Sequence, residues 1–563
     1  MMNCLVKIPA IKGKITINRK KYVFFEYNRV YHPEKKYNIP QRVTIGRVDE
    51  SDPTMMHPND NYLKYIPDGE IPTEEPAGKH SHCLRVGTFI VIQKLLQYLR
   101  ISEILSKYFS PKETGLFLDL AAYSIICECN AGQYYPDYGY NHPLFTPGMH
   151  IYSDSKVSDF LGSITTDHSV AFVNDWNSSH DHREKIYISY DSTNKNCQAG
   201  DLEIVEYGHP KVEKGLPVFN YSIAYDTNNR LPLFYEEYPG SVVDVSQLQY
   251  MLDKAKEYGY RHAGFILDRG YFSKSNIQFM MKNGYDFVIM MKGKKKMVRE
   301  LIQQNQGAFE NKRSCGIREY KAYGMTVKGK LFADDTEECY FHLYYSDLKK
   351  SAEREAIEAK IERMAKLIKK QEGRKFEPDN VLKKYFDFYF DDDGRLLFAS
   401  EKASVIEEEI SLCGYYVIVT SERMTAREAI TLYKSRDTSE KLFRGDKSYL
   451  GNDSLRIGGD ESASSKIFVE FVALIIRCRI YTLLKDEEKR TDTRANYMTV
   501  PAAIKELEKI EMIKLPQGRY RLSYALTATQ KNILLAFGLN EDDVKREAYK
   551  ISEALHETEG GVA

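Results

Sequence analysis

Apolar residues recur along the middle of the chain in patterns that predict a mixed α/β unit. Alternating or continuous apolar runs predict strands at residues 186–193, 218–226, 231–238, 265–268 and 286–291. Helical spacing predicts two helices among them, at Ser246–Gly259 and Ser273–Asn283. The resulting order, β-β-β-α-β-α-β, predicts a sheet in which the first and fourth strands lie side by side.

Further apolar patterns predict helices and an insertion outside this sheet. Thr88–Phe109 and Gly115–Ile126 carry helical stripes and predict a small helical domain. A later strand is expected at Gly414–Thr420, and the chain before it is too long for one crossover. We therefore expect an insertion there, with a strand at Tyr340–Tyr345 and a charged helix at Ala352–Gly373.

The charged helix of the insertion has a narrow apolar seam. Its members repeat at intervals of four, three and four residues: Ile357, Ile361, Met364 and Ile368. Such a seam suits either a partner helix in a dimer or packing within its own domain. The run Asp391–Gly394 lies between two short strand patterns, so we interpret it as a hairpin turn rather than a metal cluster.

These patterns divide the 563 residues into seven segments. Residues 1–48 are a basic β-rich module, 49–78 an acidic proline-rich linker and 79–180 a helical domain. The catalytic sheet is expected in two parts, 181–300 and 411–490, separated by the insertion at 301–410. Residues 491–563 are expected to form a C-terminal helical segment.

The charge of the chain is balanced overall but unevenly distributed. The formal net charge is +0, yet residues 1–48 hold eleven Lys and Arg against two Glu, with aromatic residues interleaved. This combination predicts a β-ribbon that binds DNA, with Lys20, Lys21 and Arg42 among its contacts. The alternative is a solvated β-domain with lysines on its edges. A second basic run, Lys292–Lys296, follows the strand at 286–291.

Other compositional features narrow the class of protein. The nine cysteines are an odd number and form no CxxC pair, so we expect free thiols rather than a zinc site or a disulfide framework. No apolar run approaches the length of roughly 18 residues that a membrane span needs, and no signal peptide is recognised. We therefore expect a cytoplasmic protein.

Two aspartates close apolar strand patterns. Asp191 follows Ile186–Tyr190, and Asp268 follows Ala263–Leu267. An acidic residue in this position suits the rim of a sheet, where the sites of α/β folds gather. Each has a plain alternative, since Asp191 could cap a turn and Asp268 could pair with Arg269. Together they suggest two ligands of one metal site.

A third carboxylate lies in a predicted helix at Tyr433–Lys447. Four side chains fall within an arc of roughly 60° on one face of that helix, namely Tyr433, Arg436, Glu440 and Lys447. A carboxylate between two cations could coordinate a metal and hold a phosphodiester beside it. Gly445 makes the position of Lys447 on that face less secure.

These motifs resemble those of DDE transposases, from about Asp49 to the C-terminal segment. The spacing within Tyr433–Lys447 resembles the Tyr-Arg-Glu-Lys signature of bacterial insertion-sequence transposases. Further motifs of the resemblance are Pro58–Tyr62, Tyr190–Thr193, Asp268–Phe272 and Gly414–Thr420. One departure is Asp437, where many relatives carry an aromatic residue, so no role of that aromatic is carried over.

The resemblance implies a ribonuclease-H-like catalytic domain and two-metal phosphoryl transfer. Asp191, Asp268 and Glu440 would be the catalytic residues and would bind Mg²⁺, with Mn²⁺ as a substitute. Arg436 and Lys447 would hold phosphates, and Tyr433 would position a phosphate or a base. The partners would be terminal inverted repeats and target DNA, with a homodimer forming on DNA in a bacterial nucleoid. The alternatives are a structure-specific metal-dependent nuclease and a catalytically idle DNA-binding descendant.

Overall fold

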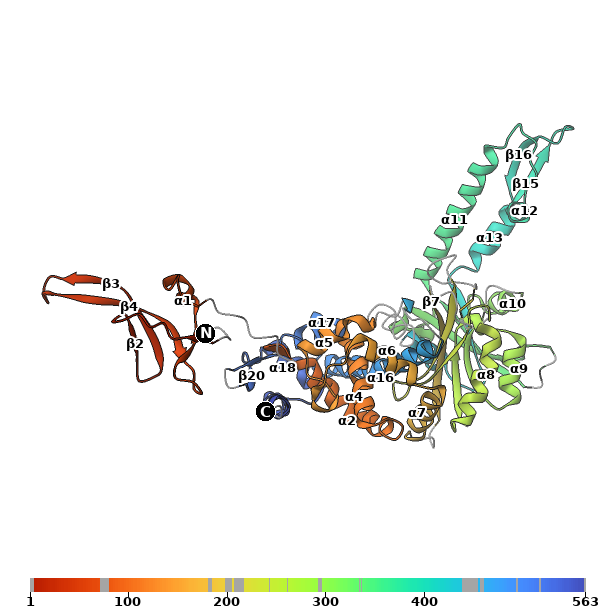
Figure 1. Cartoon of the computed structure of the whole chain (residues 1–563). Coiled ribbons are helices and arrows are strands. Elements are labelled where there is room, and N and C mark those ends of the chain that lie inside the picture. Colours follow the sequence, from red (N-terminus) through yellow and green to blue (C-terminus); the bar gives the residue numbers. More distant parts are fainter. Residues whose placement is uncertain are drawn as a thin grey trace.

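The computed structural model shows three parts along the chain: a small N-terminal unit, a large body and a protruding arm (Figure 1). It describes all residues except 1–4, 71–79, 181–184, 198–204, 207–216, 243, 261, 292–295, 334, 336, 438–453, 456–459, 493–494, 516–517 and 561–563.

The N-terminal unit is a five-stranded antiparallel sheet with one short helix, α1 (Asp60–Tyr65). Its strands are ordered β1-β5-β4-β3-β2, with β1 at Val6–Lys7, β2 at Ile15–Ile17, β3 at Tyr22–His32, β4 at Tyr37–Val48 and β5 at Met55–Pro58. The predicted β-ribbon is confirmed by the pairing of β3 with β4. Its core also includes Met56, Tyr62 and Ile66. The predicted linker 49–78 therefore begins too early, because β5 and α1 bury apolar side chains in the same core.

The body is built on one large mixed sheet. Its path runs β12-β13-β14-β17-β11-β10-β7-β8-β9. The strands predicted between 186 and 291 are all present, as β7 (Ile186–Cys197), β8 (Val218–Asp226), β9 (Leu231–Pro239), β10 (Ala263–Leu267) and β11 (Asp286–Met290). The other members are β12 (Gly316–Ile317), β13 (Ala322–Gly329), β14 (Cys339–Tyr345), β17 (Tyr415–Thr420) and β18 (Ser454–Leu455), which pairs with β7.

Two segments of the chain that are far apart in sequence meet in this sheet. The strand predicted at Tyr340–Tyr345 is β14, and it pairs along its whole length with β17. It belongs to the central sheet and not to the insertion, because its alternate side chains Phe341 and Leu343 are buried in the main core. The inserted segment consequently starts after β14, near residue 347, rather than at 301.

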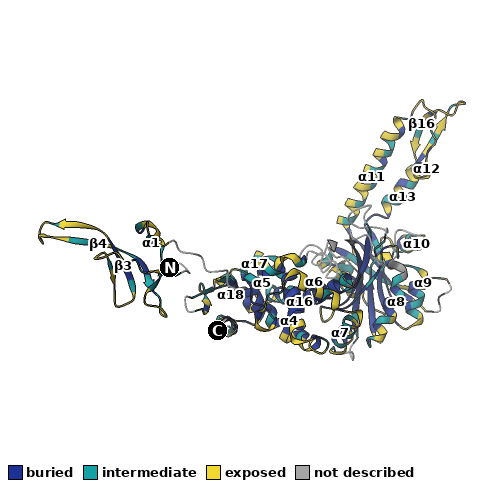
Figure 2. Ribbon diagram, in the orientation of Figure 1, coloured by how far each residue is buried: buried dark blue, intermediate teal, exposed yellow. Residues whose placement is uncertain are grey.

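Helices cover both faces of the sheet. The predicted helices are present as α8 (Asp244–Glu257) and α9 (Lys274–Lys282), which cover one face, and α10 (Lys296–Asn305) follows them (Figure 1). On the other face, α14 (Ala426–Ser435) packs against β10, β11, β14 and β17, and α16 (Asp460–Thr491) packs against β9. The sheet is thus buried on both sides, as Figure 2 shows.

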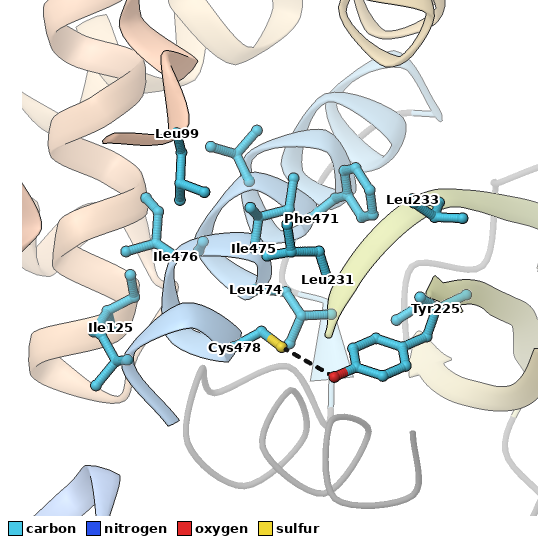
Figure 3. Close-up of a cluster of buried hydrophobic side chains, with 14 of the residues drawn as sticks. Leu99, Ile125, Tyr225, Leu231, Leu233, Phe471, Leu474, Ile475, Ile476 and Cys478 are labelled. Atoms are coloured by element: carbon cyan, nitrogen blue, oxygen red, sulfur yellow. Dashed lines mark hydrogen bonds between the residues drawn. The ribbon is translucent and has the colours of Figure 1, made fainter. Parts of the chain in front are cut away.

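The helix α16 joins the sheet to the helical region at 79–180. That region contains α2 (Gly87–Leu99), α3 (Ile101–Leu105), α4 (Pro111–Cys127), α5 (Tyr135–Asn141), α6 (Asp154–Ser163) and α7 (Thr166–Ser178). Figure 3 shows Phe471, Leu474 and Ile476 of α16 among side chains from both neighbours. A single core therefore runs through the predicted boundary between 180 and 181.

The C-terminal residues return to the start of the helical region. The segment predicted as helical contains α17 (Val500–Leu507), α18 (Ala528–Ala536) and α19 (Glu541–Gly560). It also contains two strands, β19 (Glu511–Lys514) and β20 (Tyr520–Leu522), which form a three-stranded sheet with β6 (Cys83–Arg85).

The arm is a helical hairpin closed by a small sheet. It comprises α11 (Asp347–Lys369), α12 (Asn380–Tyr385), β15 (Phe386–Phe390), β16 (Leu396–Glu401) and α13 (Ala403–Ser411). Ile361 and Ile368 of the predicted seam are buried in the arm's own core, against side chains such as Leu396 and Ile406. Of the two interpretations of the seam, packing within its own domain is confirmed. The run Asp391–Gly394 is the turn between β15 and β16, as predicted.

Candidate active site

Asp191 lies on β7, and Asp268 directly follows the neighbouring parallel strand β10 at the same level. The register of β7 and β10 pairs Tyr190 with Leu267, so the next residue on each side is an aspartate. Residues that face each other across a strand pair point to the same side of the sheet. The predicted adjacency of these two strands is confirmed. The predicted end of the first strand at Asp191 differs from the structure. There, β7 continues to Cys197, because β8 pairs with it beyond Asp191.

Local hydrogen bonds hold both aspartates in their turns and strands. The backbone N–H of Ser192 donates to Oδ1 of Asp191 at 2.9 Å, and that of Arg269 donates to Oδ1 of Asp268 at 2.7 Å. Behind them, the buried hydroxyl of Tyr271 donates to Oγ of Ser192 at 3.0 Å. This bond ties the turn after Asp268 to the strand that carries Asp191. It therefore helps to fix the positions of the two carboxylates relative to each other.

Helix α14 brings a cation to the same edge of the sheet. Ala426, Ala429, Ile430 and Tyr433 form its buried stripe, and a capping box of Thr425 and Glu428 starts it. The helix ends at Ser435, and Arg436 is its C-cap. Nη1 of Arg436 lies 3.6 Å from Oδ1 of Asp268.

The predicted helix at Tyr433–Lys447 is described only at its start. Tyr433 lies in α14, Arg436 is the C-cap of α14 with helical backbone angles, and residues 438–447 lie outside the described residues. Tyr433 is 5% exposed and packs in the cluster that contains Ile266 and Val288. The Arg436 guanidinium lies 5.6 Å from the ring centroid of Tyr433, and Tyr433 also lines a cavity described below, so its expected contact with a phosphate or base stays a prediction.

Glu440 and Lys447 lie outside the described residues, as do Lys292–Lys295 of the second basic run. Within the part of the chain that the structure describes, no group of three or more His, Cys, Asp or Glu side chains is arranged to hold a metal ion. Asp191 and Asp268 supply two carboxylates, and Glu440 follows Arg436 by four residues in the sequence.

A cavity of about 450 Å³ opens next to Arg269. Arg269, which directly follows Asp268, lines it together with Tyr433 and Lys434 of α14. Lys349 of α11 lines it from the base of the arm. The cavity wall therefore combines three cationic side chains with the carboxylate of Glu353 and with apolar side chains, and cations of this kind can bind a phosphate-bearing ligand.

A buried ion pair lies further along β7 and was not predicted from the sequence. Nζ of Lys195 lies 2.8 Å from Oε2 of Glu470, and the two side chains are 0% and 1% exposed. Lys195 also lies over the ring of Tyr221, and Asn130 donates to Glu470. A signal was available, because Glu470 is the only charged residue in the apolar run 467–476. The pair fixes the strand that carries Asp191 to α16.

The three basic residues singled out at the N-terminus occupy different positions. Lys20 and Lys21 lie at the turn between β2 and β3. Arg42 lies on β4, and its Nη2 is 3.6 Å from the carboxylate of Glu26. Glu26 also accepts a hydrogen bond from Arg29 at 2.6 Å, and these two arginines lower the pKa of the carboxyl, with the Arg29 hydrogen bond contributing most.

Among the residues that the structure describes, no helix combines the length and the apolar character that crossing a membrane requires. The described cysteines for which a state is assigned are free: Cys83, Cys127, Cys129, Cys315, Cys339, Cys413 and Cys478.

Comparison with known proteins places these features in a family. None of the curated proteins matches the chain. Among solved structures, the chain is similar to a piggyBac transposase in a synaptic complex with hairpin DNA, determined by cryo-EM. That similarity has a TM-score of 0.33 and 8% sequence identity, and covers 72% of this chain and 68% of that chain. The family described as "Transposase DDE domain" matches residues 185–476, just over half of the chain, and so includes Asp191, Asp268 and Arg436. The chain therefore belongs to the transposase DDE domain family.

Proposed function

We propose that this protein cuts the ends of its own insertion sequence and joins them to target DNA by metal-dependent phosphoryl transfer. The observation that carries the proposal is that Asp191 and Asp268 each directly follow the last residue pair between β7 and β10, Tyr190 with Leu267, while Arg436 lies 3.6 Å from Asp268. Membership of the transposase family supplies the class of reaction.

The donor set fits a hard divalent cation. Asp191, Asp268 and Glu440 are the residues that would hold Mg²⁺, with Mn²⁺ as a substitute, because carboxylate oxygens are the ligands these ions prefer. When bound, two such ions supply activation of a water or a DNA 3′-hydroxyl and stabilisation of the leaving oxygen. The donor set favours these ions over zinc, because it consists of carboxylates and contains neither His nor Cys.

The protein's own residues bind and orient the DNA backbone. Arg436 is 13% exposed on its side chain and points at the carboxylate edge, so it can hold a phosphate next to the scissile bond. Lys447, which follows Glu440 by seven residues in the sequence, is proposed for the same role. The cavity adds Arg269 and Lys434, two further cations that we assign to the DNA strand flanking the scissile bond.

The arrangement of the sheet supports a ribonuclease-H-like catalytic domain. In the order β9-β8-β7-β10-β11, the first three strands form an antiparallel meander and β10 and β11 run parallel to β7. Both aspartates then lie on the central pair of strands. The segments before and after this unit are proposed as accessory regions, with the N-terminal unit binding DNA and a homodimer forming on the DNA ends.

Two other functions share most of these features. A structure-specific nuclease would use the same carboxylates and cut without joining. A DNA-binding protein without activity would need only the fold. The clustering of Asp191, Asp268 and Arg436 at one edge of the sheet argues against this function, because DNA binding alone does not require carboxylates at that edge.

Incubation of the full chain with duplexes of its own element ends, a target plasmid and Mg²⁺ separates the three functions. Sequencing of the products should show cleaved ends joined to target DNA, and Asp191→Asn should give neither product. Cleaved ends without joints would establish the nuclease instead. Absence of both products, with end binding intact, would establish the inactive protein.

A further inference from the structure

The distal half of the β3–β4 ribbon has two faces of different chemistry, and it extends beyond the core of its unit. The buried residues of this ribbon lie near its base, at Val23, Phe25, Ile45 and Val48. Beyond them, most residues from 27 to 42 are exposed (Figure 2). An isolated two-stranded hairpin is only marginally stable in water, so a long exposed ribbon indicates a surface that is covered by a partner.

The base of the ribbon is braced. A register shift between Glu26 and Asn28 leaves Tyr27 unpaired, and bulges of this kind bend and twist a strand pair. The Tyr27 ring packs on that of Tyr65 in α1, with 5.1 Å between their centroids. The ribbon therefore leaves its core in one set direction.

One face carries amides and branched apolar side chains, and we call it the amide face. The register pairs Asn28 with Gln41 and Val30 with Ile39. The two pairs are two residues apart along each strand, so their side chains lie on the same face of the ribbon. The amides of Asn28 and Gln41 contact each other across 3.5 Å, a long and weak hydrogen bond that is readily exchanged for a better partner. Val30 is 46% exposed.

The opposite face, which we call the arginine face, is partly neutralised. Arg29 and Arg42 both contact Glu26, whose own side chain is nearly buried. Their charges are therefore shared with a carboxylate, which would be repelled by DNA phosphates. Four lysines lie at the two ends of the ribbon, with Lys20 and Lys21 at one turn and Lys35 and Lys36 at the other.

This distribution matches the major groove of duplex DNA. The groove is about 12 Å wide and admits a two-stranded β-ribbon. Asn and Gln side chains form paired hydrogen bonds with adenine N6 and N7, and apolar side chains contact the thymine methyl group. Five residues from Asn28 to His32 span about 17 Å at about 3.4 Å per residue, which corresponds to about five base pairs. Lysines at both ends suit the phosphates that border such a site.

We propose that the β3–β4 ribbon lies in the DNA major groove with its amide face, Asn28, Val30, Ile39 and Gln41, reading A·T base pairs. The proposal rests on the proposed function only for the choice of DNA as partner. It assigns sequence recognition to the ribbon, and not to the three basic residues Lys20, Lys21 and Arg42, which contact phosphates or Glu26.

The test is selection of a randomised duplex pool by the full chain, followed by binding measurements on the enriched duplex. The wild type should enrich adjacent A·T pairs. The Asn28→Ala/Gln41→Ala variant should bind that duplex about tenfold more weakly, the scale of one paired amide–base contact. Its affinity for an unselected duplex should be unchanged. The matched control Gln97→Ala/Gln303→Ala removes two exposed amides elsewhere and should behave as the wild type.

Base analogues identify the groove. Replacement of adenine by 7-deaza-adenine in the enriched duplex removes only a major-groove acceptor, and should weaken wild-type binding but not that of the double variant. A loss confined to 3-deaza-adenine would overturn the proposal in favour of the minor groove. It would also be overturned if Arg29→Ala abolished selectivity while Asn28→Ala/Gln41→Ala retained it. These experiments measure binding only. The ribbon proposal can therefore be overturned while cleavage and joining are observed, and it can be supported even if the protein neither cuts nor joins DNA.

Discussion

Lys195 of β7 and Glu470 of α16 form an ion pair of 2.8 Å that is closed off from solvent on both sides. The strand that carries Asp191 is thereby held against the longest described helix, whose other neighbours include α4, α6 and α7. The position of the carboxylate edge consequently depends on the helical region as well as on the sheet.

Lys195→Met should destabilise the protein strongly. Removal of one partner leaves Glu470 buried and unpaired, which typically costs about 3–5 kcal/mol. Lys366→Met, which breaks the exposed pair with Glu362, is the matched control and should cost under about 1 kcal/mol. Urea denaturation of both variants measures the difference, and equal midpoints would show that the buried pair contributes no more than a surface one.

Asp268→Asn and Glu440→Gln should each abolish cleavage and joining while end binding persists. Each amide keeps the shape of the side chain and loses the negative charge that a divalent cation requires. Gel assays of cleavage and of binding, performed on the same preparations, provide the measurement. Asp392→Asn, in the exposed turn of the arm, is the control. Near-normal joining by either variant would remove that residue from the site.

Arg436→Ala should slow strand transfer by about 10²-fold, the scale of losing one electrostatic donor from an active site. The physical reason is its position 3.6 Å from Asp268 at the edge where a phosphate would bind. Single-turnover joining of pre-cut ends measures the effect, and Lys447→Ala should behave similarly. Arg354→Ala, on the exposed side of α11, serves as control. A loss of less than about threefold would correspond to an ordinary surface ion pair.

Deletion of residues 1–70 should weaken DNA binding far more than it lowers the thermal stability of the body. The N-terminal unit has its own core, and Glu70, the last described residue before the gap at 71–79, contacts Lys7 and Tyr62 of this unit. Binding by the intact chain should also fall steeply with salt, because phosphate contacts release counterions. Unchanged affinity after the deletion would transfer DNA binding to the body. A cut at residue 48 is a poor substitute, since it would expose Met56 and Ile66.

Stability should fall as the pH rises through the range set by Asp119. This side chain is fully buried in α4, and burial raises its pKa to about 7 from an ordinary value of 3.8, against the hydrogen bonds from Phe145 and Thr146. Between these two values the folded state keeps a proton that the unfolded state has released, so folding is favoured at the acidic end of the window. Above about pH 7 the contribution is lost.

Urea denaturation at pH 5 and pH 8 measures this dependence, which corresponds to about 1.4 kcal/mol per pKa unit. Asp119→Asn should be less stable than the wild type at pH 5, because its amide group cannot accept all three hydrogen bonds. It should also show a smaller change between the two pH values. An identical pH dependence in the two proteins would assign the titration to another group.

The local pattern of the sequence determined the strands β7 to β11, the two aspartates beside each other and the basic β-ribbon. Period-two and period-3.6 patterns reveal which face of an element is apolar, and a residue that breaks an apolar run is visible in the same way. Only the tertiary structure decided what covers each face. Burial of apolar surface is not directional, so the pattern of β14 could not reveal that β17 is its neighbour. For the same reason, the burial of Tyr433 under the sheet and the pairing of Lys195 with Glu470 across 275 residues depended on contacts that no local window contains.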